Sequence, residues 1–446
     1  MVLKNTINLK YINKLAIPAL ISGISEPILS ITDTAIVGNI PINAVESLAA
    51  VGIVGTFMSM LIWILGQTRS AISSIVSQYV GANNLKAVKN LPAQAIFIVT
   101  SISILIIIST YPFASQIFKL YNASSIILDY SVAYYQIRVF GFPFTLFTMA
   151  VFGTFRGLQN TYHPMIIAMI GALSNIVLDV ILVYGVTGLI EPMHIKGAAY
   201  ASVIAQVLMA AFSVYFLLKK TPISLKPNFP FNSEINRFIL MVLNLFIRTL
   251  ALNITLYFAT RFATGYGKTY IAAYTIAINL WFLGAFMIDG YSSAGNILSG
   301  KLYGAKDYKL LVALNQKLIK IGVLVGVILA ITGFVIYKPI GLLFTKETDV
   351  LNQFYSVFWI VLIMQPICAI AFIFDGVFKG LGKMKLLRNV LLLSTFIIFL
   401  PVLYVLDYFN LKLNGIFIAI TFWMIARSIP LLINFRKQFI ALAKNS

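Results

Sequence analysis

The sequence predicts an all-α polytopic membrane protein, with about twelve transmembrane helices in two pseudo-symmetric six-helix bundles around a central cleft. Three observations support this prediction. The chain of 446 residues is 60% hydrophobic and only 10% charged, whereas a soluble domain carries about 25% charged residues. Long apolar runs recur along its length, and the two halves of the sequence resemble each other.

Each apolar run is long enough to cross a membrane. A hydrocarbon layer of about 30 Å requires about 20 helical residues, because each residue adds about 1.5 Å. The runs lack the alternating pattern of a membrane β-barrel, so they are interpreted as helices. The first run is too long and too interrupted for a cleavable signal peptide. In chain order the expected spans are 12–38, 47–80, 93–118, 130–157, 163–185, 196–218, 234–262, 270–300, 308–336, 352–380, 386–408 and 413–436.

The chain repeats itself at a shift equal to half of its 446 residues. Each half holds an even number of expected spans, so both halves take the same orientation, as in transporters built from parallel repeats. A duplicated scaffold without transport is the alternative. The expected domains are an N-terminal bundle (1–220), a proline-rich cytoplasmic linker (221–233) and a C-terminal bundle (234–446). The matching pairs are GTFRGL at 153–158 with GVFKGL at 376–381, Gly81 with Gly304, Ser70 with Ser293, Leu48 with Ile271, and Pro143 with Pro366.

The net charge of +20 follows the membrane topology. Lys and Arg residues concentrate in the termini and in the loops of one side, which the positive-inside rule assigns to the cytoplasm. The expected location is therefore the inner (plasma) membrane, with both termini cytoplasmic and some attraction to anionic lipid heads. No basic aromatic groove accompanies the charge, which argues against nucleic-acid binding. The single cysteine, Cys368, excludes an intrachain disulfide and a cysteine metal cluster.

Most acidic residues lie in expected loops or at helix ends, but a few lie inside the expected spans, where a charge is unfavourable. A carboxylate at the centre of a membrane helix costs about 2.5–3.5 kcal/mol on insertion scales, so it usually faces the bundle interior and has a role. The alternative is a buried pair that only holds helices together. The acids inside expected spans are Glu26, Asp33, Asp179, Asp289 and Asp375.

Asp33 and Asp179 are the candidate coupling site. Both are expected in the outer half of the N-terminal bundle. Neighbouring carboxylates in a poorly hydrated pocket repel each other, so the pair is expected to hold a proton or a small cation. Asn175 precedes Asp179 by four residues and shares its helix face. The Asn175 amide either completes the pocket or only makes an interhelical hydrogen bond.

The other embedded charges lie mostly in the second half. Asp289 and Asp375 are expected near the cytoplasmic end, as an inner gate or a second cation site. Lys379 follows Asp375 at i+4, which permits an ion pair. The embedded bases are each expected to pair with an acid or a carbonyl oxygen; they are Arg69, Arg138, Arg248 and Arg427.

Two prolines, Pro18 and Pro27, fall inside the first span below Asp33. Proline removes a backbone hydrogen bond and bends a helix. A bend below a protonatable acid would let the charge of that acid alter the shape of the helix. A static kink is the alternative.

Enzyme chemistry is not expected. The two histidines, His163 and His194, fall in expected loops. The sequence contains no HExxH metal motif, no GxSxG nucleophile turn and no P-loop. Transport would therefore draw on an ion gradient, with no cofactor other than the coupling ion.

Several segments resemble one transporter family. IPALISGISEPILSITDTAIVG (17–38) and LAAVGIVG (48–55) are similar to helices 1 and 2 of the multidrug and toxic compound extrusion (MATE) transporters. The resemblance covers essentially the whole chain, and the second half is similar to the branch named for DNA-damage-inducible protein F (DinF). The other matching segments are FGTFRGLQNT (152–161), LSNIVLDVILVYG (173–185), GAAYAS (197–202), MIDGYSSAGNILSGKLYGA (287–305) and FDGVFKGLG (374–382).

The resemblance implies a bundle of six plus six helices that exports cationic, amphipathic compounds in exchange for protons or sodium ions. The positions that match the family's cation site in the N-terminal half are Asp33, Asn175, Asp179 and Ser202. The family's bending proline in helix 1 matches Pro18, and Pro27 is a further one.

Helix 7 departs from one branch of the family. The NorM branch carries an acid in this helix for a second sodium site, whereas NLFIRTLALNITLYFATRF (244–262) contains none. Coupling through Asp33 and Asp179 therefore fits better, with protons favoured and sodium ions as the second choice.

The predicted function is multidrug efflux by a secondary active antiporter that works by alternating access, as a monomer. The main rival is a lipid-linked oligosaccharide flippase of the same superfamily, in which Arg248 and Arg427 would bind pyrophosphate. A channel or a scaffold is a further rival. The expected partners are small-molecule substrates and the lipid bilayer.

Overall fold

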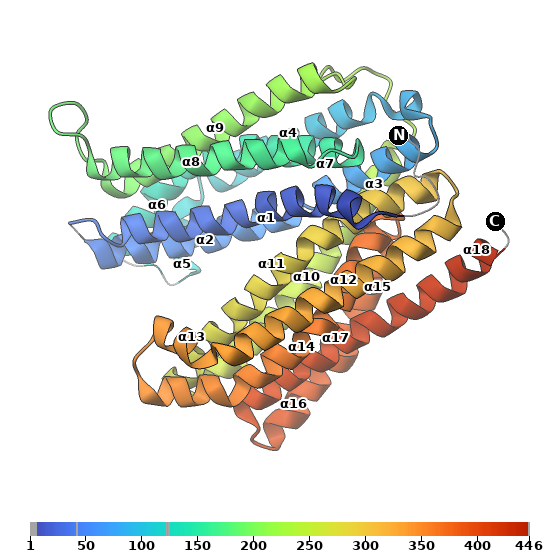
Figure 1. Ribbon diagram of the computed structural model, residues 1–446. Coiled ribbons are helices and arrows are strands. Elements are labelled where there is room, and N and C mark those ends of the chain that lie inside the picture. The colour runs from blue at the N-terminus through green and yellow to red at the C-terminus, as the bar shows by residue number, and fades with distance from the viewer. Residues whose placement is uncertain (1–6, 42, 122, 124, 445–446) are drawn as a thin grey trace. The chain divides into compact units, whose positions relative to one another are not determined.

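The computed structural model of the 446-residue chain describes residues 7–41, 43–121, 123 and 125–444, and the side chains of residues 25–31 lie outside this description. Helices form almost all of the described chain (Figure 1). No strand occurs among the described residues, where a single bridge pair, Val186 with Ile190, closes a loop. The predicted all-α class is confirmed.

The helices follow one another with short connections. In the first half they are α1 (Leu9–Val37), α2 (Ala44–Leu65), α3 (Thr68–Gly81), η1 (Leu85–Val88), α4 (Leu91–Thr110), α5 (Ala114–Lys119), α6 (Ser125–Arg138), η2 (Val139–Gly141), α7 (Phe142–Gly157), α8 (Tyr162–Tyr184) and α9 (His194–Lys220). In the second half they are α10 (Ile235–Gly265), α11 (Lys268–Gly304), α12 (Tyr308–Val335), α13 (Tyr337–Phe344), α14 (Thr348–Gly380), α15 (Met384–Leu393), η3 (Ser394–Phe399), α16 (Leu400–Tyr408), α17 (Lys412–Phe435), η4 (Arg436–Ile440) and α18 (Ala441–Lys444).

Eleven helical stretches of the described chain are long and apolar enough to cross a membrane. Each coincides with one of the expected spans after the first. The first expected span coincides with α1, whose 29 residues are also sufficient in length. The prediction of a multi-pass membrane protein is therefore confirmed.

One expected span, 93–118, is wrong at its end. The backbone N–H of Tyr111 makes a helical bond to the carbonyl oxygen of Ile107 at 2.8 Å, and α4 ends there. The next residue, Pro112, has no N–H to continue the ladder. The chain turns and forms the separate short helix α5, which the hydropathy pattern did not distinguish.

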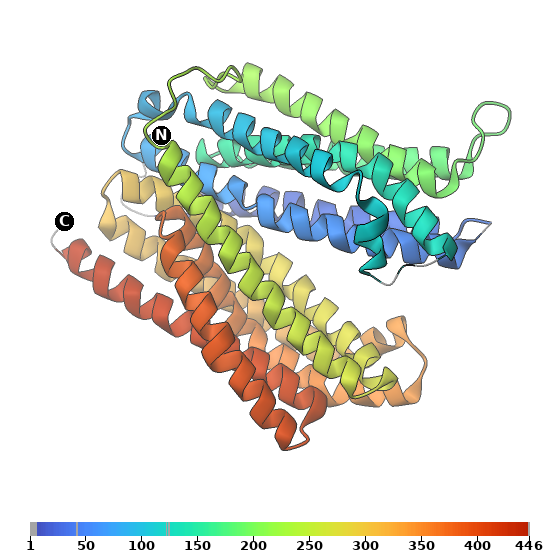
Figure 2. The same cartoon turned by 180° about the vertical axis from the view of Figure 1, so that it is seen from behind.

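The described chain divides into two compact units. The first, called the C-unit here, contains the described residues within 1–20, 77–83 and 243–446; the second, the N-unit, contains those within 21–76 and 84–242. Three helices, α1, α3 and α10, therefore begin in one unit and end in the other. In the N-unit, α8 and α9 lie side by side in both views (Figure 1 and Figure 2).

The expected linker, 221–233, lies within the N-unit and is held there by one buried side chain. The amide nitrogen of Gln94, on α4, donates to the carbonyl oxygen of Asn228 at 2.5 Å. The amide oxygen of Gln94 accepts from the backbone N–H of Asn232 at 2.8 Å. These bonds, together with the buried side chain of Ile223, fix the course of the segment.

The internal repeat extends to helix packing. A methyl group added at Gly153, on α7, would lie 2.5 Å from the carbonyl oxygen of Arg69 on α3. The same addition at Gly376, on α14, would lie 2.0 Å from the carbonyl oxygen of Ser292 on α11. The two glycines and the two carbonyls are each half a chain apart, so one close helix crossing occurs once in each unit. Such contacts between small residues replace the hydrophobic effect as the basis of helix association in lipid.

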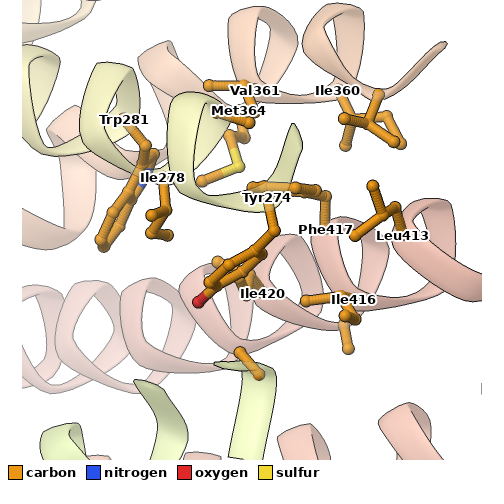
Figure 3. Packing of buried hydrophobic residues seen from close by; sticks show 14 of the residues in the cluster. Tyr274, Ile278, Trp281, Ile360, Val361, Met364, Leu413, Ile416, Phe417 and Ile420 are labelled. Carbon is orange, nitrogen blue, oxygen red and sulfur yellow. The ribbon is translucent and has the colours of Figure 1, made fainter. Parts of the chain in front are cut away.

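The interior of the C-unit is apolar and rich in aromatic rings. Side chains from α11, α14 and α17 interlock around Tyr274 and Trp281 (Figure 3). The indole N–H of Trp281 donates to the sulfur of Cys368 at 3.3 Å, and Cys368 is fully buried. This packing holds α14 and α17 at fixed positions, and both helices carry the buried charges described below.

Candidate functional site

Four polar side chains gather inside the N-unit. Asp33 lies near the end of α1, Asn175 and Asp179 lie on α8, and Ser202 lies on α9. All four are buried, with exposed fractions of 4% for Asp33, 2% for Asn175, 0% for Asp179 and 3% for Ser202. The family resemblance placed these residues at one site, and the described geometry brings them together.

Hydrogen bonds connect the four residues in two pairs. The amide nitrogen of Asn175 donates to Oδ2 of Asp179 at 3.1 Å, as their i, i+4 spacing on one helix face allows. The hydroxyl of Ser202 donates to Oδ2 of Asp33 at 3.2 Å. The carboxyl groups of Asp33 and Asp179 lie within hydrogen-bonding reach of each other, which joins the two pairs.

One oxygen of each carboxyl group is left without a donor. Among the described residues, no group donates a hydrogen bond to Oδ1 of Asp33 or to Oδ1 of Asp179, and both atoms are buried. Two adjacent carboxylates that each keep one buried oxygen without a donor are costly in an apolar interior. A proton shared by the pair, or a small cation between them, would remove that cost.

The sequence reasoning missed a neighbour of this pair, Tyr134 on α6. The Tyr134 hydroxyl is hydrogen-bonded to Arg138 and lies within electrostatic range of both carboxyl groups, and Arg138 lies within electrostatic range of Asp179. Arg138 was expected as an embedded base, but a tyrosine in an apolar helix carries no signal of its own. The i, i+4 spacing of Tyr134 and Arg138, which puts both on one face, is the only hint that the sequence offers.

Helix α1 links this site to the rest of the chain. Pro18 is half-buried in α1, and the helix passes from the C-unit to the N-unit two residues later, between Leu20 and Ile21. The side chains of Glu26 and Pro27, both singled out from the sequence, lie outside the described residues.

Asp375 is surrounded by cations. Arg248, on α10, approaches its Oδ1 at 2.5 Å, and Lys379 approaches its Oδ2 at 2.9 Å. Both oxygens are therefore occupied, and this argues against a second cation site at Asp375. Asp289 is exposed on α11 and lies within electrostatic range of Lys379.

The expectation that each embedded base pairs with an acid or a carbonyl is wrong for Arg427. Its guanidinium lies over the ring of Trp423 at 4.7 Å and donates to the sulfur of Met424 at 3.4 Å. Neighbouring residues of its own helix α17 supply both contacts, whereas Asp375, whose charge Arg427 feels, is in contact with Arg248 and Lys379. Arg69, on α3, is half-buried, and its Nε has no hydrogen-bond partner among the described residues.

Comparisons with known proteins agree with the repeat and the fold. The MatE family model matches residues 18–181 and again residues 242–405. DNA damage-inducible protein F of Escherichia coli is 26% identical over 84% of this chain and 81% of its own length. The probable multidrug resistance protein NorM of Thermotoga maritima is 24% identical over 94% of this chain and 90% of its own. A crystal structure of MATE in the bent conformation superposes with a TM-score of 0.90 at 22% identity, over 98% of this chain and 96% of that one.

The two matched segments together cover well over half of the chain, and each contains one copy of the repeat. The order of the motifs, the helical membrane fold and the relatives all agree. The chain therefore belongs to the MatE family, the multidrug and toxic compound extrusion transporters, and is a multi-pass membrane transporter.

Proposed function

We propose that this protein is a secondary active antiporter of the inner (plasma) membrane, which exports cationic amphipathic compounds in exchange for protons. The observation that carries the proposal is the buried pair Asp33 and Asp179, whose carboxyl groups lie within hydrogen-bonding reach. Each keeps one buried oxygen without a donor among the described residues. Such a pair can gain and lose a proton with little movement of the surrounding atoms.

The pair couples charge to transport. With its proton lost, the site carries excess negative charge inside the N-unit and attracts a cationic substrate. A proton that arrives from outside is shared by Asp33 and Asp179 and cancels this attraction. The hydroxyl of Ser202 and the amide of Asn175 hold the two carboxyl groups in place in both states. Substrate leaves outward, and the site returns inward to release its proton.

Helix α1 converts the change of charge into a change of shape. It carries Asp33 near one end, and Pro18 interrupts its hydrogen-bond ladder close to the position where the helix passes between the units. Solved structures of similar fold are described as a bent and as a straight conformation of MATE, so two shapes are recorded for proteins of this fold. Protonation relieves the repulsion at Asp33, and α1 then bends near Pro18.

Sodium ions are the second candidate for coupling. Carboxylate, amide and hydroxyl oxygens are hard ligands that suit such a cation. The hydrogen-bonding reach between the two carboxyl groups favours the proton, because a shared proton requires close oxygens whereas a metal ion separates them.

The test is ethidium efflux from proteoliposomes, with proton and sodium gradients imposed separately. We expect wild-type protein to use the proton gradient and Asp33→Asn to lose this transport. The matched control is Asp129→Asn, which removes an exposed carboxylate of the same unit and should leave efflux unchanged. Efflux that persists in Asp33→Asn would make the pair structural and reject the proposal. Transport driven by sodium alone would replace the proton with sodium at the same residues.

A further inference from the structure

The C-unit contains a buried cluster with an excess of positive charge. Three cationic side chains converge from three helices: Arg248 from α10, Lys379 from α14 and Arg427 from α17. Asp375 is the one carboxylate buried among them within the described chain, at 7% exposure. Burying unpaired charge is expensive in protein and in lipid, so an excess of cations calls for an explanation.

Asp375 is in direct contact with two of the three cations, and Arg427 is not one of them. Arg248 and Lys379 occupy its two oxygens at 2.5 Å and 2.9 Å. Arg427 feels the charge of Asp375 but also the repulsion of Arg248, and no ion pair forms between Arg427 and any described carboxylate. The third cation of the cluster is therefore without an anionic partner in the described chain.

The surroundings of Arg427 are apolar, and the residue is only 4% exposed. Trp423 and Phe372 lie beneath its guanidinium, with ring centroids at 4.7 Å and 5.8 Å. Its hydrogen bond goes to the sulfur of Met424, a weak acceptor. No described oxygen accepts from Arg427, although a guanidinium carries five N–H donors in a fork that suits a carboxylate.

The cluster is connected to the surface of the unit. Lys379 is half-buried, and Asp289, which lies within electrostatic range of it, is exposed. An anion that enters beside Lys379 would be drawn inward by increasing positive charge.

We propose that this cluster binds the carboxylate group of a small organic anion. Arg427 supplies the unused donors, Arg248 and Lys379 supply further positive charge, and the rings of Trp423 and Phe372 accommodate the apolar body of the ligand. This site lies in a different unit from the Asp33 pair and extends the protein's ligands beyond the cations of the proposed function. A carboxylate fits better than a bare halide, because the guanidinium fork pairs two oxygens at once.

Calorimetric titration with sodium benzoate tests the site in purified protein held in lipid nanodiscs, at constant ionic strength set with sodium chloride. We expect saturable benzoate binding to wild type. In Arg427→Gln the affinity should fall about ten- to a hundredfold, the effect of losing a hydrogen bond to a charged group. Arg427→Lys keeps the charge and should lose less. The matched control is Arg436→Gln, an exposed arginine just after α17, which should bind benzoate as wild type does.

A second measurement locates the ligand even if Arg427→Gln fails to fold. Benzoate beside Trp423 should change its fluorescence, so Trp423→Phe should lose the signal change, whereas Trp359→Phe, at an exposed position, should retain it. Absence of saturable binding, equal affinity in Arg427→Gln, or a fluorescence response independent of Trp423 would each overturn the proposal. Ethidium efflux is measured separately. If wild-type protein shows no proton-driven efflux but binds benzoate, the proposed function is rejected and the carboxylate site is retained.

Discussion

Asp33 and Asp179 differ from Asp375 in the groups that face them. The first two face each other, with neutral donors from Ser202 and Asn175. Asp375 faces two cations in direct contact. The same residue type is therefore under electrostatic strain in one unit and neutralised in the other, and replacement by asparagine should act with opposite sign at the two places.

Asp179→Asn should stabilise the folded protein while it abolishes proton-coupled transport. The substitution removes repulsion between two buried carboxylates and adds an amide that can donate to Asp33. A gain of about 0.5–2 kcal/mol is in the range of stabilising changes made at strained functional sites. Thermal unfolding in detergent, followed by tryptophan fluorescence, measures the shift, with Asp129→Asn as the reference. A lower unfolding temperature would mean that the pair is stabilising as it stands.

Asp375→Asn should destabilise the C-unit. Arg248 and Lys379 would both lose their counter-ion, and breaking a buried ion pair costs about 3–5 kcal/mol. The same unfolding experiment should therefore give a clear decrease in the unfolding temperature, in contrast to the increase at Asp179. Wild-type stability in Asp375→Asn would show that water or another anion compensates the two cations.

At the level of helices, close packing depends on glycine at matched positions. A methyl group added at Gly81 would lie 1.8 Å from the carbonyl oxygen of Lys301, and one at Gly304 would lie 1.8 Å from the carbonyl oxygen of Gln78. Both contacts belong to the C-unit, where α3 meets the end of α11. The two glycines are related by the repeat, so the contact is reciprocal.

Gly81→Ala and Gly304→Ala should each destabilise the protein by about 1–3 kcal/mol, because the backbones must move apart. Gly52→Ala is the matched control on α2, since nothing lies within 4 Å of its added methyl group. That control should be neutral or stabilising, because alanine favours the helix by about 1 kcal/mol over glycine. The unfolding temperatures of the three variants test this prediction. Equal changes in unfolding temperature at all three positions would contradict the packing argument.

A hydrogen bond ties the loop between α10 and α11 to α16. The hydroxyl of Tyr266 donates to Oδ1 of Asp407 at 2.5 Å. Burial, and then the hydrogen bond to Asp407, raises the pKa of Tyr266 above its usual range. A raised pKa in the folded state contributes stability that is present below the ordinary value of about 10 and is lost as the pH rises further.

Tyr266→Phe should therefore reduce stability by about 1.5–3 kcal/mol at neutral pH, the range for a hydrogen bond to a charged group. The variant should also lose less stability than wild type as the pH rises above about 10, because it has no phenol to ionise. Unfolding temperatures measured from pH 7 to alkaline pH test both effects. Parallel pH curves for wild type and variant would show that Tyr266 does not carry the alkaline transition.

The helices could be predicted from the sequence to a large extent, because hydropathy and length determine where a chain can cross a membrane. The short helices α5 and α13 could not, since they continue apolar runs and differ only in a turn. Asn175 and Asp179 were predictable neighbours because they share one helix face. Arg248 and Asp375 lie on different helices, so only tertiary packing brings them together. Tyr134 could not be predicted, because its role follows from its place beside Asp33 and Asp179 and not from its residue type.

For the molecule as a whole, the repeat and the distribution of charge predict which loops face each side of the membrane. Each half crosses the membrane an even number of times, so the linker at 221–233 should share the cytoplasmic side with both termini. The loop that follows α8 should lie outside. The native Cys368 is buried and should react little with polar thiol reagents, so introduced cysteines can report on each side.

Lys226→Cys in the linker and Leu189→Cys in the loop after α8 give a direct test. Leu189 is 84% exposed, and Lys226 lies in the segment held by Gln94. In intact cells a membrane-impermeant maleimide should label Leu189→Cys and spare Lys226→Cys, and both should react after the membrane is opened. The wild-type chain measures the background from Cys368. Labelling of Lys226→Cys in intact cells would invert the topology, and protons from outside would then have to reach Asp33 from the opposite end of α1.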